Sequence, residues 1–121
     1  MRIENTGLEG VTIDLELLDD IAENIGLVRA GQWDYERVTY DRKIEFKGDI
    51  FYLRVQGYAI EGEVDGKHAV IKLITPLLGK HYYPHGVEYG EGEHFPNTVL
   101  NTSKKLLNDL SEAIKNLNSS Q

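Results

Sequence analysis

The chain has 121 residues, the length of one domain with a single core, and we treat residues 1–121 as one domain. It contains no cysteine, which excludes disulfide bonds, thiolate catalysis and cysteine-rich zinc sites. Its net charge of −7 makes nucleic acid and anionic membranes unfavourable partners, because both are bound mainly through basic side chains. No stretch approaches the roughly 18 apolar residues of a membrane span, and the first residues lack an apolar signal core, so we expect a cytoplasmic location.

The first clear element is an amphipathic helix that begins after Asp14. Asp14 is a good N-cap, and apolar residues recur at helical spacing between Leu15 and Ile25. Gly26 is typical of the C′ position, where the backbone turns left-handed. The sequence therefore predicts a helix near the N-terminus that buries one of its faces.

Residues 27–74 have the pattern of strands that are joined by tight turns. β-Branched and aromatic residues alternate with polar ones, and the segments KGD (47–49) and DG (65–66) are typical of hairpin turns. We expect the strands at residues 27–32, 38–46, 50–58, 59–64 and 69–74. The clearest alternation lies in residues 50–58, where Gly57 is expected to mark a bulge or a bend.

A second helix is predicted from Pro96 or Asn97 to Leu117, and residues 116–121 are expected to fray. Because the connections between the strands are short, we expect an antiparallel meander sheet of four to five strands. The fold class is then α+β, with the N-terminal and the C-terminal helix packed on one face of the sheet. The other face is expected to carry Tyr52 and Arg54, and to be either solvated or used for contacts.

Several short motifs occur in a fixed order along the chain. They are GQWDY (31–35), YDRKI (40–44), YLRV (52–55), GEVDG (62–66), TPLL (75–78) and FP (95–96). Over nearly the whole chain, this order resembles the YugN-like family of small cytoplasmic proteins from Bacillus and its relatives. The resemblance implies an α+β domain and brings with it no established activity and no catalytic residues. It includes His81 and Tyr83, and it thins at His85 and His94.

Three of the four histidines lie within residues 81–94, HYYPHGVEYGEGEH. His81, His85 and His94 are candidate zinc ligands, with a nearby glutamate as a further ligand. Pro84 excludes the helix on which a His-x₃-His pair converges, and on a strand residues i and i+4 stand about 13 Å apart. Only a loop folded back on itself would bring the three histidines together. A solvated loop is the simpler interpretation, and we expect no cofactor.

The segment QWDYE, residues 32–36, has two interpretations. In a ligand pocket, Trp33 would stack on the ligand and Asp34 would anchor a polar group, with Arg54 and His81 completing the site. At a strand end, Trp33 would instead cover the core and Asp34 would cap a turn through its side chain. The second interpretation is the simpler one, because an isolated tryptophan in a small domain usually packs against the core.

Charged side chains on the strands also have two interpretations. Arg54 could bind an anionic ligand, but pairing across the sheet with Asp41 or Glu63 is the simpler expectation. Glu61 and Glu63 share a strand face and could form a carboxylate pair for acid–base catalysis. Edge strands also carry such charges to prevent aggregation. The sequence has no glycine-rich phosphate loop and no nucleophile elbow that would favour catalysis.

These observations favour a non-catalytic accessory or protein-interaction domain. The unassigned sheet face, together with tyrosines and histidines in an expected loop over residues 76–95, is typical of a protein contact surface, and we expect a homodimer. The alternative is a small-molecule-binding protein or metal-dependent enzyme with a site centred on His81. The sequence specifies neither a substrate nor the identity of a partner.

Overall fold

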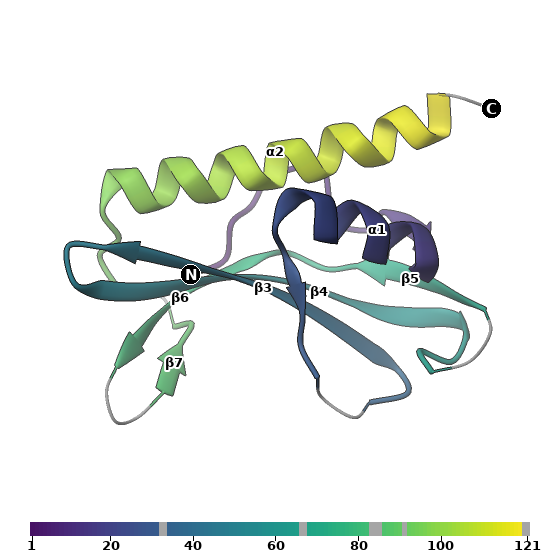
Figure 1. Ribbon diagram of the computed structural model, residues 1–121, viewed down its shortest axis with the longest axis horizontal. Helices are drawn as coiled ribbons and strands as arrows, with labels where there is room; N and C mark the ends of the chain where they lie inside the picture. Colours follow the sequence, from purple (N-terminus) through teal and green to yellow (C-terminus); the bar gives the residue numbers. More distant parts are fainter. Residues whose placement is uncertain (32–33, 66–67, 83–85, 91, 120–121) are drawn as a thin grey trace.

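The computed structural model describes residues 1–31, 34–65, 68–82, 86–90 and 92–119. These residues form an antiparallel sheet with two helices on one side of it (Figure 1). In chain order the elements are β1 (Thr12–Asp14), α1 (Leu15–Ile25), β2 (Val28–Arg29), β3 (Arg37–Phe46), β4 (Asp49–Gly62), β5 (Ala69–Leu73), β6 (Leu77–Tyr82), β7 (Gly86–Glu88) and α2 (Asn97–Ser119). The predicted α+β class, with one helix near each end of the chain, is confirmed.

The sheet is organised around the long strand β4. Its strand order is β1-β5-β4-β3-β2, and all of the pairs are antiparallel. One edge of β4 is paired with β3 over residues 49–58, from Phe46↔Asp49 to Arg37↔Tyr58. The other edge is shared, because β6 pairs with Phe51–Arg54 and β5 pairs with Gly57–Gly62. The chain passes from β5 to β6 between these two halves, where the backbone N–H of Ile74 donates to the carbonyl of Gln56.

The hydrophobic core lies between the sheet and the two helices. Phe51, Leu53 and Val55 point into it from β4, as their alternation predicts, and each is at most 1% exposed. Both helices contribute buried residues to the same core, namely Leu15, Leu18 and Ala22 from α1 and Val99, Leu107, Leu110 and Ile114 from α2. Both helices therefore cover one face of the sheet, as Figure 1 shows.

Helix α1 begins and ends at the expected residues. The Asp14 side chain accepts a hydrogen bond from the backbone N–H of Glu16, and Gly26 adopts a left-handed φ of 93° at the C-terminus. The helix is also joined to the sheet by the buried Tyr40 of β3, whose hydroxyl donates to Asp19. Arg29 donates to the other oxygen of Asp19 at 3.0 Å. This network fixes the position of α1 over β3.

Some details of the expected secondary structure differ from the structure. Residues 77–82 and 86–88 form β6 and β7, although residues 76–95 were expected to form a loop. Within the described part of the strand expected at 27–32, only Val28–Arg29 form a strand, and residue 32 lies outside the described residues. Gly57 is not at the bulge, which lies between Ala59 and Glu61. Helix α2 continues to Ser119, two residues beyond the expected end at Leu117, and the fraying expected over residues 116–121 stays a prediction.

The sheet face opposite the helices, called the open face below, is defined by β3, β4 and β6 residues. It carries Thr39, Asp41, Tyr52, Arg54, Gln56, Tyr58, Leu77 and His81, as follows from the strand registers. No α-helix in the described part of the chain covers this face (Figure 1). Among the described residues, no helix is both long enough and apolar enough to cross a membrane.

Candidate functional site on the open sheet face

Large apolar side chains gather at one end of the open face. Tyr35 is 44% exposed, Tyr58 is 39% exposed and Ile74 is 36% exposed. They come from three different segments, namely the turn before β3, the second half of β4 and the residue after β5. Singly exposed apolar residues are ordinary on a protein surface, whereas a group of them around one hollow is a feature of binding sites.

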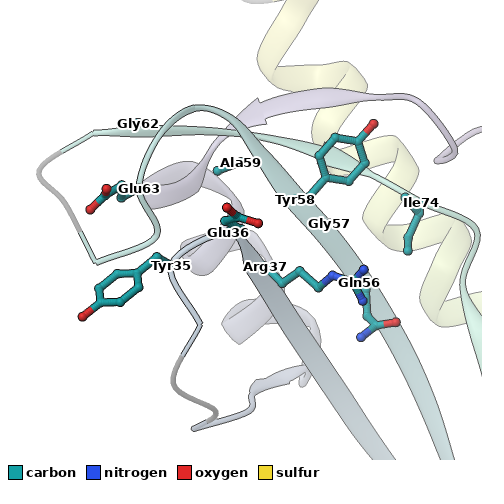
Figure 2. A pocket seen from close by; sticks show the side chains of 10 residues that line it. All are labelled: Tyr35, Glu36, Arg37, Gln56, Gly57, Tyr58, Ala59, Gly62, Glu63 and Ile74. Atoms are coloured by element: carbon teal, nitrogen blue, oxygen red, sulfur yellow. The ribbon is translucent and has the colours of Figure 1, made fainter.

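A solvent-open cavity of about 1080 Å³ lies among these side chains. We call it the trough and define it by Tyr35, Glu36, Arg37, Tyr58, Glu63 and Ile74. Figure 2 shows Tyr35 and Glu63 toward one side of the trough and Tyr58 and Ile74 toward the other, with Glu36 between them. Arg37 extends toward Gln56 in the same view. The trough therefore combines aromatic, aliphatic, acidic and basic side chains.

Backbone hydrogen bonds hold the segment that carries Tyr35, Glu36 and Arg37. The Asp34 carboxylate accepts hydrogen bonds from the backbone N–H of Glu36 at 2.8 Å and of Arg37 at 3.2 Å. This arrangement is the turn cap that the sequence predicts for Asp34. The carbonyls of Tyr35 and Glu36 accept from the N–H groups of Val64 and Ala59, at 2.9 Å and 2.8 Å. The side chains are thus displayed from an ordered backbone.

The three charged side chains of the trough are available to a ligand, as far as the described residues show. In the described part of the chain, Glu36, Arg37 and Glu63 form no ion pair and no side-chain hydrogen bond. All three residues are exposed. Two carboxylates against one guanidinium leave the trough with a net negative charge.

At the centre of the open face, Arg54 is already paired. Its Nε and Nη2 donate to the two carboxylate oxygens of Asp41 at 2.9 Å and 3.1 Å, so the pairing expected across the sheet is confirmed. The hydrogen bond to Asp41 is also the main reason that the pKa of Arg54 is raised. The guanidinium carbon lies 4.8 Å from the ring centroid of Tyr89. Because its donors are used in this way, Arg54 is poorly placed to recognise an additional anion.

Tyr89 covers this pair from the segment after β7. Its ring lies above Gly79 of β6, where an added Cβ would stand 2.6 Å from a Tyr89 ring carbon. Its hydroxyl oxygen is buried, and among the described residues no group meets it in regular hydrogen-bond geometry. Burial raises the pKa of the Tyr89 hydroxyl above its ordinary value, although the Arg54 guanidinium is near enough to oppose this rise. The open face is therefore packed around Arg54 and hollow around Tyr58.

The candidate metal ligands are only partly described. His81 lies on β6, is half-buried, and is paired in register with Val87 of β7. His94 is exposed and lies before α2. His85 falls outside the described residues. Within the residues that are described, no group of three or more His, Cys, Asp or Glu side chains could hold a metal ion. The three-histidine metal site stays a prediction.

The candidate pocket of Trp33, Asp34, Arg54 and His81 is also only partly described, because Trp33 lies outside the described residues. Arg54 and His81 share the open face, but Arg54 is in register with Leu77, four residues or about 13 Å from His81 along β6. Asp34 lies before the first residue of β3, whereas Arg54 is in register with Asp41, four residues into that strand. These three residues are spread along the face, and the pocket stays a prediction.

Sequence reasoning missed most of the trough. Tyr35 was noted only as part of the QWDYE segment and Glu63 was considered in other roles, but Glu36, Arg37, Tyr58 and Ile74 were not selected. These residues come together because β3 and β4 place Arg37 opposite Tyr58, and because Ile74 is hydrogen-bonded to Gln56. Pairings between distant residues create the site, and local periodicity contains no signal for them.

The family model, the similar sequences and the similar crystal structure all point to the same protein family. The YugN-like family matches residues 3–115. The uncharacterised protein YlbA of Bacillus subtilis is 56% identical over 115 residues, which cover 95% of this chain and 96% of YlbA. The uncharacterised protein YugN of the same organism is 25% identical over 91 residues, which cover 74% of this chain and 68% of YugN. The crystal structure of the uncharacterised conserved protein YugN from Geobacillus kaustophilus HTA426 matches with a TM-score of 0.86 and 51% identity, and covers 98% of each chain.

Proposed function

The chain belongs to the YugN-like family, and from the geometry of its open face we propose that it is a non-catalytic cytoplasmic protein-interaction domain. The observation that carries this proposal is the asymmetry of the sheet. Both helices lie on one face, whereas the other displays Tyr58 and Ile74 around the trough. The absence of cysteine supports a reducing, cytoplasmic location.

The composition of the open face supports a contact with protein. Tyrosine is enriched at protein interfaces, because its ring offers a large rigid surface and its hydroxyl remains compatible with water. Tyr35 and Tyr58 combine this property with substantial exposure. Self-association is one form of such a contact, and the homodimer expected from the sequence belongs to the same proposal.

The experiment compares two substitutions that place a carboxylate on opposite sides of the molecule. Ile74→Asp changes the open face, and Leu17→Asp changes α1 at a residue of similar exposure, 45% against 36%. The mass in solution is measured by light scattering, and partners are identified by cross-linking in cells and mass spectrometry. We expect Ile74→Asp to alter the mass or to remove specific partners, and Leu17→Asp to change neither.

One outcome would contradict the proposal. A wild-type protein that is monomeric, and whose cross-linked partners are the same for both variants, would contradict a contact through the open face. Circular dichroism and thermal unfolding of both variants establish that each one is folded before the comparison is made.

A further inference from the structure

The trough has a charge pattern that favours a cation. Glu36 and Glu63 line it, and Asp34, Glu61 and Asp65 lie in the adjoining segments, with Arg37 as the basic residue among residues 34–37 and 61–65. The whole chain carries a net charge of −7. An approaching cation is therefore attracted both over a distance and within the trough.

The aromatic side chains of the trough give the same preference. The faces of Tyr35 and Tyr58 are electron-rich, and a lysine or arginine head group is attracted to such a face within about 6 Å. Long basic side chains also place their methylene stems on apolar surface while the charge stays near water. Ile74 and Tyr58 offer this surface at the side of the trough opposite Glu63 (Figure 2).

The size and floor of the trough favour a peptide over a small molecule. Its volume of about 1080 Å³ is slightly above the roughly 300–1000 Å³ that is usual for small-molecule pockets, and it is open to solvent. Its floor is the β4 backbone, which is paired with β3 on one edge and with β5 on the other. A bound segment therefore cannot add a strand here and must be recognised through side chains.

We propose that the trough binds an extended peptide segment of a partner protein that inserts a lysine or arginine side chain between Glu36 and Glu63. The inference rests on the proposed function, since it names the chemistry of the partner at the same face. The stem of the basic side chain packs on Tyr58 and Ile74. Arg37 donates hydrogen bonds to backbone carbonyls of the peptide. The trough thus selects a basic side chain that is flanked by uncharged residues.

The probe is a synthetic library of acetylated and amidated heptapeptides. The central residue is Lys, Arg, Glu or Ala, and the flanking positions are randomised among uncharged residues. The full chain is immobilised, retained peptides are identified by mass spectrometry, and the dissociation constant of the best retained peptide is measured by fluorescence polarisation. We expect Lys and Arg to be enriched at the centre, and the affinity to fall as salt is raised.

Two variants with the same change of net charge provide the control. Glu36→Gln with Glu63→Gln neutralises the trough, and Glu16→Gln with Glu23→Gln neutralises two exposed carboxylates on α1. We expect the trough variant to lose the preference for Lys and Arg and to weaken binding about fivefold or more, whereas the α1 variant binds like wild type. All four substitutions are at exposed positions, and unfolding curves verify that both variants are folded.

Three outcomes would overturn the inference. One is that no peptide is retained, or that Glu or Ala is selected as often as Lys. Another is that the preference persists when Glu36 and Glu63 are neutralised. The third is that spermidine binds the trough as tightly as the best peptide, which would identify a free amine as the ligand.

These outcomes are distinguishable from a failure of the proposed function. If Ile74→Asp removes a partner or a dimer while the library shows no basic preference, the open face is a contact surface and the inference about its chemistry fails. If the library selects Lys but Ile74→Asp changes neither mass nor partners, the chemistry of the trough holds and the proposed contact fails.

Discussion

Arg54 and Asp41 face each other across β4 and β3 and are joined by two parallel hydrogen bonds, of 2.9 Å and 3.1 Å. Their side chains are 26% and 22% exposed, and the ring of Tyr89 lies over the guanidinium. An ion pair in this position is screened less than one at the surface, and its bidentate geometry makes it stronger than most.

We therefore expect Arg54→Ala and Asp41→Ala each to lower the free energy of unfolding by about 1–2 kcal/mol. Each substitution leaves the other charge partly buried without its partner. In the double variant this penalty disappears, so the loss should be smaller than the sum of the two single losses by about 1 kcal/mol. Urea unfolding of the four proteins measures this coupling. Strictly additive losses would show that the pair contributes nothing beyond packing.

Substitution of Tyr89 is expected to raise stability, in contrast to the substitutions of Arg54 and Asp41. Its hydroxyl oxygen is buried and has no regular hydrogen bond to any of the described residues, and an unsatisfied group of this kind costs about 1–3 kcal/mol of stability. Tyr89→Phe removes the hydroxyl and keeps the ring over Arg54. We expect the variant to unfold at a higher urea concentration, with a gain of about 1 kcal/mol. Tyr58→Phe, at an exposed position of the same face, is the control and should be nearly neutral. A loss of stability in Tyr89→Phe would show that a polar partner, such as the Arg54 guanidinium or a bridging water, stabilises the hydroxyl.

Ionisation of Tyr40 is expected to make the free energy of unfolding depend on pH in the alkaline range. Its pKa is raised above the ordinary value, first by burial and then by the hydrogen bond to Asp19, while the Arg29 charge lowers it. In the unfolded chain the Tyr40 hydroxyl releases its proton near pH 10, whereas in the folded protein it still holds the proton at that pH. The stabilising contribution is thus fully present below about pH 10 and is lost as pH rises above it, by up to about 1.4 kcal/mol per pH unit.

Tyr40→Phe removes this titration. We expect the unfolding free energy of wild type to fall more steeply than that of Tyr40→Phe above pH 10, so that the difference between them narrows. Below pH 10 the difference should be constant, because neither folded nor unfolded Tyr40 ionises there. Equal slopes in both proteins above pH 10 would mean that Tyr40 reaches solvent. Tyr89, whose pKa is also raised, contributes with the same sign to both proteins.

The contrast between β4 and β6 explains how much of the fold could be predicted. In β4 the alternation of Phe51, Leu53 and Val55 with polar residues is complete, and it correctly predicted both faces. The expected pairing of Arg54 across the sheet is also confirmed, with Asp41 as the partner and not the alternative, Glu63. In β6 the sequence LLGKHY contains a glycine at residue 79, which is typical of a loop. The structure shows that Tyr89 occupies the space above Gly79. A long-range contact thus replaces the missing side chain, and periodicity cannot reveal it.

The same reason explains why the trough was not predicted. Its members are ordinary surface residues when each is considered alone, and Glu36, Arg37 and Tyr58 follow no recognisable motif. They become neighbours only through the register of β3 on β4 and through the return of the chain at Ile74. What the sequence did indicate was a face that lacks an assigned partner, and the trough lies on that face.

Gly57 provides a test of how tightly the sheet packs beneath the trough. A Cβ at this position would stand 2.4 Å from Cγ2 of Ile71 and 2.9 Å from the carbonyl oxygen of Lys72. Ile71 is fully buried, and the carbonyl belongs to the backbone of β5, so neither can move aside without disturbing the core. Glycine is therefore required here by close approach of β5 and not by a bulge.

We expect Gly57→Ala to lower the free energy of unfolding by about 1–3 kcal/mol through overpacking. Gly31→Ala is the matched control, because an added Cβ there has no atom of the described residues within 4 Å and should leave stability unchanged or slightly higher. If β5 moves outward to accept the new methyl group, Ile74 moves with it and the trough changes shape. Peptide binding by Gly57→Ala should then weaken along with stability, whereas an unchanged unfolding curve would show that β4 and β5 are less closely packed than the structure indicates.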